Sequence, residues 1–386
     1  MGGGAERERV LRADGRRLRA RQRGDGVGAG AGRPRRRALT LAVCAALLAG
    51  AGGASRAQPP APTLEQLVGQ KLVVSMTGTR PSPALLARAR RGQIGGVIVH
   101  GFNFSSATQL RAITRQLHAA AAAGGQPRLL VAVDQEGGSV KTVPWIPPTV
   151  APPRTASVGV AVDQGRRTGA ALRALGIDVD LAPVADVPAS RASFVYRQGR
   201  TWSFDAAETT GLAGAFALGV SQSHALATMK HFPGLGLARA NTDHHVVRIR
   251  APKARLAPGL RPYRQAVAQR VPLVMLSNAI YDAWDPVNAA GWSRAISTQL
   301  LRGRLGFRGV TITDSLSGAA HARGIPPNGL AIGAANAGTD LLLVTGSEAA
   351  SRSVFNSLLR AARTGRVNRS SLEASYQRIL ALKSSR

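Results

Sequence analysis

The sequence predicts an α/β fold: a single-domain (β/α)8 barrel of the TIM type. Two observations lead to this prediction. Eight short apolar runs recur from residue 62 onward, separated by Ala-, Arg- and Leu-rich stretches with helical spacing. Ionisable or amide side chains follow most of these runs. Eight strand-helix units are the number that closes such a barrel.

The apolar runs are continuous in Val, Ile and Leu and do not alternate with polar residues. Parallel strands that are buried on both faces have this pattern. No segment rich in Pro, Ser or Gly separates a second domain after residue 350, so we expect residues 58–386 to form one domain. In chain order the runs are 71–76, 94–99, 129–133, 179–184, 225–229, 272–277, 309–313 and 340–344.

Polar residues lie at the ends of six successive runs. A strand can end in a polar residue simply because it reaches solvent, so one such position would indicate little. Six in series favour a site, because the carboxyl ends of barrel strands meet at one mouth. From the second run to the seventh, these residues are His100 and Asn103, Asp134 and Glu136, Asp186, Lys230 and His231, Asn278, and Asp314.

Residues 1–57 are predicted to be a basic leader with a signal or anchor segment. An Arg- and Gly-rich stretch, 1–37, precedes the apolar stretch 38–50, and Ser55-Arg56-Ala57 has the small residues of a cleavage site. The apolar stretch is too short to span a bilayer comfortably. We therefore expect a secreted or envelope-associated protein whose mature chain starts near Gln58, with an uncleaved amino-terminal anchor as the alternative.

Cysteine usage and charge narrow the possible functions further. Cys44, the only cysteine, lies in the leader, so the mature chain should contain no disulfide and use no thiol chemistry.

The predicted mature chain is strongly basic. Residues 1–57 hold 13 Arg and 4 acidic residues, which leaves 38 basic and 16 acidic residues in the mature chain and a formal net charge of +22. Such a charge predicts attraction to anionic cell-wall polymers. Nucleic acid is not an expected partner, because the arginines are scattered and aromatic residues are few. No obligate protein partner is inferred.

One loop concentrates reactive groups. Lys230-His231-Phe232-Pro233-Gly234, followed by Asp243-His244-His245, brings together a cation, three imidazoles and a carboxylate just past the fifth run. The simplest alternative is a polar surface loop without a catalytic role. A metal-dependent hydrolase is another, with ligands among Asp134, His231, Asp243, His245 and Asp314. Against a metal site, Thr77-Gly78-Thr79 follows the first run, where the paired HxH ligands of such barrels would be expected.

Several motifs, in this order, resemble those of family 3 glycoside hydrolases of the single-domain β-N-acetylglucosaminidase type. The resemblance implies a (β/α)8 fold, no cofactor and no metal. It also implies retaining, exo-acting hydrolysis of terminal β-linked N-acetylhexosamine from cell-wall fragments or related glycans. The motifs are Gly95-Gly96-Val97-Ile98 with Asn103, Asp134-Gln135-Glu136-Gly137-Gly138, 180–187 (DLAPVADV), Lys230-His231-Phe232-Pro233-Gly234 and 306–314 (GFRGVTITD).

The resemblance also implies roles for individual residues. Asp314 would be the nucleophile that forms a covalent glycosyl-enzyme, since an oxocarbenium-like transition state needs a nearby carboxylate. The local sequence alone allows another role, a cap of the helix that follows. Asp243 and His245 would form the acid/base pair, in which the carboxylate fixes the imidazole; His244 is the alternative acid if the loop register differs.

Sugar binding is assigned by the same resemblance. Asp134 would accept hydrogen bonds from ring hydroxyls, Lys230 and His231 would donate to them, and Arg200 matches the family's sugar-contacting arginine. The chain also departs from the family pattern. The spacer between Gly236 and Asp243 is two residues longer, Leu235 replaces a common His, and Ser139 replaces a usual Arg, with Lys141 as a possible substitute.

Other functions remain open beside hydrolysis of N-acetylhexosaminides, and the longer spacer and Ser139 motivate the first of them. One is a catalytically impaired barrel that binds sugars or cell wall. The others are a β-glucosidase or a glycoside phosphorylase of the same family.

Overall fold

A computed structural model describes residues 61–385, and the predicted leader lies outside them. Eight parallel strands hydrogen-bond in the order β12-β9-β7-β6-β3-β2-β1-β13, and a bridge between Ile312 and Leu341 joins the two ends of this series. The predicted barrel is confirmed, and each predicted apolar run contains one strand. The strands are β1 (Leu72–Ser75), β2 (Gly96–Ile98), β3 (Leu130–Val133), β6 (Val179–Asp180), β7 (Leu226–Phe232), β9 (Leu273–Leu276), β12 (Val310–Thr313) and β13 (Leu342–Val344).

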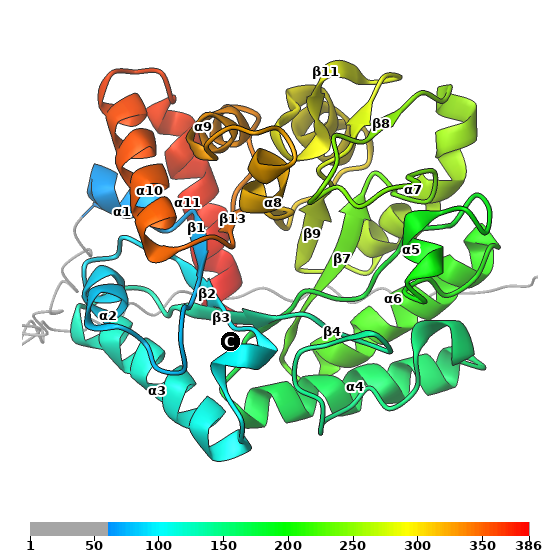
Figure 1. Cartoon of the computed structure of the whole chain (residues 1–386), viewed down its shortest axis with the longest axis horizontal. Helices are drawn as coiled ribbons and strands as arrows, with labels where there is room; N and C mark the ends of the chain where they lie inside the picture. Colours follow the sequence, from blue (N-terminus) through cyan, green and yellow to red (C-terminus); the bar gives the residue numbers. More distant parts are fainter. Residues whose placement is uncertain (1–60, 386) are drawn as a thin grey trace, which may run out of the picture. The chain divides into compact units, whose positions relative to one another are not determined.

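Helices surround the barrel, as Figure 1 shows. Many of them begin at a serine or aspartate whose side chain accepts a backbone N–H of the first turn, as Ser82, Ser157 and Asp205 do. The helices are α1 (Leu64–Gly69), α2 (Pro83–Arg90), α3 (Ala107–Ala123), α4 (Val158–Ala174), α6 (Ala206–Gln222), α7 (Lys253–Ala268), the π-helical η4 (Ala295–Arg304), α9 (Asn328–Asn336), α10 (Glu348–Arg363) and α11 (Arg369–Ser384).

Apolar side chains fill both sides of the strands. Val73, Leu130 and Leu226 belong to the cluster inside the barrel, whereas Val74, Val131 and Ala227 pack toward the helices. Burial on both faces explains why the strand sequences read as continuous apolar runs. None of the helices in residues 61–385 combines the length and hydrophobicity that a bilayer crossing requires.

Two strands differ in length from the prediction. The fourth run, 179–184, contains only the two-residue strand β6, followed by Pro183, which has no N–H to donate, and by an isolated bridge between Val184 and Lys230. At the fifth run, 225–229, the strand β7 continues to Phe232, so Lys230 and His231 lie within its last residues and not in the following loop.

Buried ion pairs close the amino-terminal end of the barrel. Asp178 precedes β6 and accepts hydrogen bonds from Arg128 and Arg173, at 3.0 and 2.8 Å. Asp340 precedes β13 and pairs with Arg302 and Arg378. Both carboxylates are fully buried, and each of their four oxygens has a partner. These ion pairs link α4, η4 and α11 to the residues that precede the strands.

Short strands and helices lie at the opposite end of the barrel, after the carboxyl ends of its strands. Their connections are long and irregular, as is usual where a barrel builds a site. They are η1 (Gly101–Asn103), the hairpin of β4 (Gln135–Gly137) and β5 (Val140–Lys141), η2 (Pro152–Arg154), α5 (Phe194–Arg197), β8 (Arg248–Ile249), β10 (Ile280–Tyr281), β11 (Asp285–Ala289), η3 (Ala290–Trp292) and α8 (Leu316–His321).

Candidate active site

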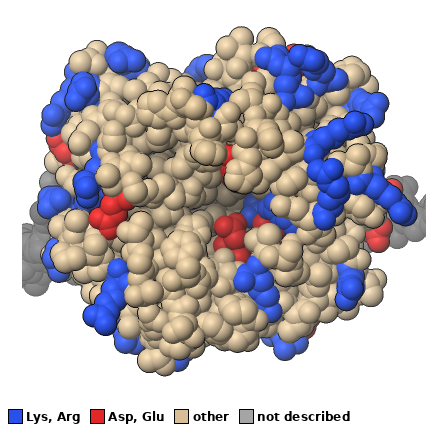
Figure 2. Space-filling view, viewed as in Figure 1, with Lys and Arg blue, Asp and Glu red and all other residues tan. Residues whose placement is uncertain are grey.

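A cavity of about 540 Å³ opens at the carboxyl ends of the barrel strands. Figure 2 shows a hollow near the middle of one face with acidic atoms inside it, while Lys and Arg side chains lie mainly toward the periphery. The polar lining comes from residues at or after several strand ends, which is the convergence that the sequence predicted. It includes His100 after β2, Asp134 after β3, Lys230 and His231 at the end of β7, Asp314 after β12 and Thr345 after β13.

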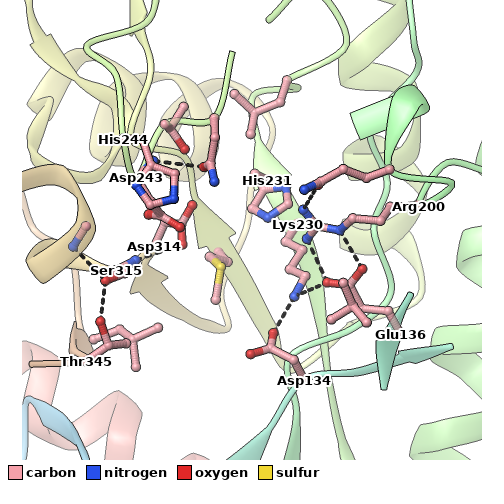
Figure 3. Close-up of a pocket in the computed structure, with 18 of the residues that line it drawn as sticks. Asp134, Glu136, Arg200, Lys230, His231, Asp243, His244, Asp314, Ser315 and Thr345 are labelled. Atoms are coloured by element: carbon pink, nitrogen blue, oxygen red, sulfur yellow. Dashed lines mark hydrogen bonds and ion pairs between the residues drawn. The ribbon is translucent and has the colours of Figure 1, made fainter. Parts of the chain in front are cut away.

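One side of the cavity is a closed network of ion pairs (Figure 3). The ammonium group of Lys230 lies 2.6 Å from Asp134 Oδ1 and 2.6 Å from Glu136 Oε1. Arg200 donates from Nε and Nη2 to the two oxygens of Glu136, at 2.8 and 2.7 Å. Glu136 therefore fixes both cations, and a bidentate pair of this kind also fixes the plane of the guanidinium.

The pairing sets the charges of this network. Burial alone would raise the pKa of Glu136, but Lys230 and Arg200 outweigh it and lower that pKa to about 2. Burial would likewise lower the pKa of Lys230, yet Asp134 and Glu136 raise it above its ordinary value. These groups are thus charged at neutral pH and present fixed hydrogen-bond donors and acceptors to a ligand.

His231 is held by a second carboxylate. Its Nδ1 lies 2.7 Å from Asp186 Oδ2, and Asp186 Oδ1 accepts the backbone N–H groups of Leu235, at 2.7 Å, and of His231. Because a carboxylate can only accept, Nδ1 carries the proton, which leaves Nε2 as the remaining polar atom of a ring that lines the cavity.

Asp314 follows β12 on the opposite side of the cavity. Its Oδ1 accepts the backbone N–H of Ser315 at 2.7 Å. The hydroxyl of Ser315 caps α8 by accepting the N–H of Gly318 at 2.9 Å. Ser315 thus serves as the helix cap, and the carboxyl group of Asp314 is part of the cavity wall.

The segment from Asp243 to His245 contributes two of its three residues to the cavity. Asp243 and His244 line it, and His245 is not among the lining residues. Oδ1 of Asp243 is buried without a hydrogen-bond partner. Neither His244 nor His245 makes an ion pair with Asp243 within the described residues, and the His244 ring instead lies edge-on to His321, with centroids 6.2 Å apart. Burial, together with the nearby charge of Asp314, raises the pKa of Asp243 to about 7.

The structure brings together most of the side chains selected from the sequence. Asp134, Arg200, Lys230, His231, Asp243 and Asp314 all line one cavity, and His245 lies outside its lining.

Sequence reasoning missed the supporting roles of Glu136 and Asp186. Both were noted at strand ends, but only the structure shows which cations and rings they hold. Ser139 is exposed and donates to the Gln198 carbonyl at 2.8 Å, and neither it nor Lys141 is among the cavity-lining residues.

The metal-ligand alternative has no geometric support in the described part of the chain. No three His, Cys, Asp or Glu side chains between residues 61 and 385 are placed so that they could hold a metal ion. The same carboxylates are instead distributed between the ion-pair network and the two groups at the other side of the cavity.

The fold and the site define a class of enzyme. Two carboxyl groups, Asp243 and Asp314, share a cavity with fixed donors for hydroxyl groups at the mouth of a barrel, which is the arrangement of a glycoside hydrolase. Residues 63–382 match the glycosyl hydrolase family 3 N-terminal domain, and the chain belongs to this family.

Relatives with known names agree with this assignment. A protein of Arthroderma benhamiae described as an uncharacterized secreted glycosyl hydrolase is 34% identical over 82% of this chain and 92% of its own length. A β-hexosaminidase of Tolumonas auensis is 35% identical over 70% of this chain and 80% of its own length.

Solved structures are similar as well. The β-N-acetylhexosaminidase of Beutenbergia cavernae has a TM-score of 0.78 and 31% identity, covering 84% of this chain and 99% of that one. The family 3 β-N-acetylglucosaminidase of a Paenibacillus species has a TM-score of 0.80 and 29% identity, again over 84% of this chain. This chain spans 63% of the Paenibacillus protein. The resemblance noted in the sequence is thereby confirmed.

Proposed function

We propose that this protein is an exported, retaining, exo-acting β-N-acetylhexosaminidase that releases terminal β-linked N-acetylhexosamine from cell-wall fragments or related glycans. The names of the Tolumonas and Beutenbergia proteins support the substrate class. The observation that carries the proposal is the carboxyl group of Asp314, which lies in the cavity opposite the network of Lys230 and Arg200.

In the first step Asp314 attacks the anomeric carbon of the bound sugar. A carboxylate suits this role, because it stabilises an oxocarbenium-like transition state and then forms the glycosyl ester. The Ser315 N–H at 2.7 Å orients the carboxylate. The bond to Oδ1 leaves Oδ2 available for the attack.

The ion-pair network positions the sugar for this attack. Lys230 and Arg200 donate to ring hydroxyls, Asp134 accepts from them, and His231 forms a hydrogen bond with a further hydroxyl through Nε2. Because Glu136 and Asp186 hold these groups in place, little conformational freedom is lost on binding.

The loop from Asp243 to His245 provides the proton donor for the leaving group. The family pattern assigns this role to His245 held by Asp243. The same group then acts as the base that activates water in the second step.

Hydrolysis of an aryl N-acetyl-β-glucosaminide tests the proposal. We expect release of the phenol, slower release from the corresponding glucoside, and β-N-acetylglucosamine as the first anomer seen by NMR. An α-anomer as first product would contradict retention. Acceleration by phosphate with formation of a sugar 1-phosphate would identify a phosphorylase.

A second candidate function is a barrel that binds sugar without turnover. The lack of an ion pair between Asp243 and either neighbouring histidine favours it. Calorimetric titration with N-acetylglucosamine oligomers separates the two functions, since a binding module would take up the oligomer and leave it intact over hours.

Export is proposed from the leader at residues 1–57, and the name of the secreted Arthroderma protein supports it. The basic mature chain would then be held electrostatically at the anionic cell wall. Amino-terminal sequencing of protein from the culture medium and from the envelope fraction tests this. A chain beginning near Gln58 is expected, and a full-length chain confined to the cell interior would contradict it.

A further inference from the structure

A buried tyrosine holds the first residues of the loop that follows β7. We call residues 233–247, which join β7 to β8, the acid/base loop, after the role proposed for Asp243 and His245. The hydroxyl of Tyr281 on β10 donates to the carbonyl of Gly234 at 3.0 Å, and the Tyr281 side chain is fully buried. This bond fixes the chain at the point where it leaves the barrel strand.

A second hydroxyl keeps Tyr281 in its donating role. Oγ of Ser277 lies 3.0 Å from the Tyr281 hydroxyl. A phenol has a single proton and a carbonyl can only accept, so Tyr281 donates to Gly234 and accepts from Ser277. Burial, and to a smaller extent the charge of Asp186, raises the pKa of Tyr281, so its hydroxyl keeps the proton at neutral pH.

The same strand holds the far end of the acid/base loop through its backbone. β8 pairs with β10 in parallel, with Arg248 opposite Ile280 and Ile249 opposite Tyr281. The Ile280 N–H donates to the Val247 carbonyl at 2.9 Å. Both ends of the loop are therefore bound to β10, one through the Tyr281 hydroxyl and the other through the main chain.

Between these ends, the segment with the acidic groups is organised by a local turn. The carbonyl of Asn241 accepts the backbone N–H groups of His244 and His245, at 3.2 and 2.9 Å. Its side-chain Oδ1 accepts the N–H of Asp243 at 2.9 Å. Such bonds fix the shape of the turn and not its place above the cavity, which depends on how the rest of the loop is held.

The other bonds that hold the start of the loop come from the main chain. The carbonyls of Gly236 and Ala238 accept the N–H groups of Ala189 and Phe194, at 3.0 and 2.8 Å. A side-chain substitution leaves these bonds in place. The hydroxyl of Tyr281 is thus a contact that can be removed by itself.

On its other side, Gly234 adjoins the sugar site. Its N–H donates to the His231 carbonyl at 2.8 Å. Asp186 accepts from the Leu235 N–H at 2.7 Å and lies 2.7 Å from His231 Nδ1. A shift of Gly234 can therefore affect either the acid/base loop or the binding of the sugar, and these two effects differ in their kinetics.

We propose that Tyr281 is a positioning residue for proton donation to the leaving group. Its hydroxyl holds Gly234 and its strand holds Val247, so that the acid/base loop presents its acid group to the glycosidic oxygen. The inference rests on the proposed glycosidase function and adds a residue to it. Tyr281 is not among the residues that line the cavity, so it acts through the loop and not on the substrate.

Leaving-group dependence provides the first test. Tyr281→Phe keeps the ring and removes only the bond to Gly234. On the β-linked dimer of N-acetylglucosamine, whose leaving group needs a proton, kcat/KM should fall by on the order of tenfold, mainly through kcat. On the dinitrophenyl glycoside, whose leaving group needs none, it should change by less than about twofold.

Tyr263→Phe is the matched control. Tyr263 is equally buried, and its ring packs edge-on against Phe232 of β7, with centroids 4.9 Å apart. Its hydroxyl has no hydrogen-bond partner within residues 61–385, so its removal should change kcat/KM on either substrate by less than about twofold. Ser277→Ala should show the pattern of Tyr281→Phe in weaker form, because Tyr281 keeps its bond to Gly234 and loses only its own donor.

Hydrogen exchange measures the position of the loop independently of turnover. In Tyr281→Phe, peptides from the acid/base loop should take up deuterium faster than in the wild type, and peptides from α4 should not change. In Tyr263→Phe, both sets should exchange as in the wild type.

Two results would overturn the proposal. Equal losses on both substrates with a raised KM would mean that the Tyr281 hydroxyl supports the sugar site through His231. Identical behaviour of Tyr281→Phe and Tyr263→Phe would mean that the bond to Gly234 has no role in the reaction. Failure of the proposed function gives a different result, since the wild type would then hydrolyse neither glycoside.

Discussion

The two ends of the barrel hold buried carboxylates in contrasting ways. At the amino-terminal end, both oxygens of Asp178 and both of Asp340 have cationic or N–H partners. At the mouth, Asp314 accepts one N–H, and Oδ1 of Asp243 accepts none. Fully paired carboxylates have no oxygen left for a substrate, whereas underpaired ones do. The number of partners therefore distinguishes the carboxylates at the amino-terminal end from the two at the mouth.

Removal of the proposed nucleophile should produce the largest effect. Asp314→Ala is expected to reduce kcat by several orders of magnitude, because no other carboxylate takes over the attack on C1. Its free energy of unfolding should stay close to that of the wild type, since Asp314 has only one hydrogen bond to lose. Steady-state kinetics and urea unfolding measure both quantities, and residual turnover near the wild-type level would contradict the assignment.

At the opposite end, Asp340→Ala should lower stability and leave chemistry intact. Loss of the carboxylate leaves Arg302 and Arg378, which are both partly exposed, without their partner, and this should cost up to about 3 kcal/mol of unfolding free energy. The kcat of the remaining folded enzyme should be unchanged. Asp163→Ala, which removes only exposed ion pairs on α4, serves as the matched control and should cost within about 0.5 kcal/mol.

Glu136→Gln tests the ion-pair network in the cavity at the mouth of the barrel. The substitution removes the charge that fixes Lys230 and Arg200, so substrate should be held less accurately. We expect kcat/KM to fall by roughly tenfold to a hundredfold, mainly through KM. Glu208→Gln, an exposed residue in the first turn of α6, should have no such effect. A wild-type KM in Glu136→Gln would show that the network does not position the sugar.

The smallest expected effect is a pH-dependent gain in the stability of the Asp243→Asn variant. An unfolded Asp ionises near pH 3.9, whereas folded Asp243 keeps its proton up to about pH 7. The native state therefore binds more protons between these values, and this residue makes the protein less stable as the pH rises through that range. Asp243→Asn should accordingly melt at a higher temperature than the wild type at pH 8 and at a similar temperature near pH 4. An offset that is independent of pH would contradict the raised pKa.

The sequence was sufficient to predict the barrel, because strands that are buried on both faces have continuous apolar sequences such as 129–133. It also placed Asp134, Lys230 and Asp314 at one mouth, since the carboxyl ends of parallel strands meet there. The sequence does not predict which side chains form ion pairs within the mouth. The link from Glu136 to Arg200 depends on side chains far apart in sequence.

Local patterns also left two roles undecided. The local sequence allowed Asp314 to be the cap of α8, and the structure shows that Ser315 is the cap, because its hydroxyl accepts the Gly318 N–H. The environment of Asp243 is set by its contact with α8 at Gly318, a tertiary contact that no spacing in the loop reveals.

The most direct test of the comparison is to trap the glycosyl-enzyme. Incubation with a 5-fluoro N-acetylglucosaminyl fluoride, followed by digestion and peptide mass mapping, should show one sugar attached to Asp314 and none on Asp340 or Asp178. A label on another side chain, or no label while hydrolysis proceeds, would contradict the assignment of Asp314 as the nucleophile.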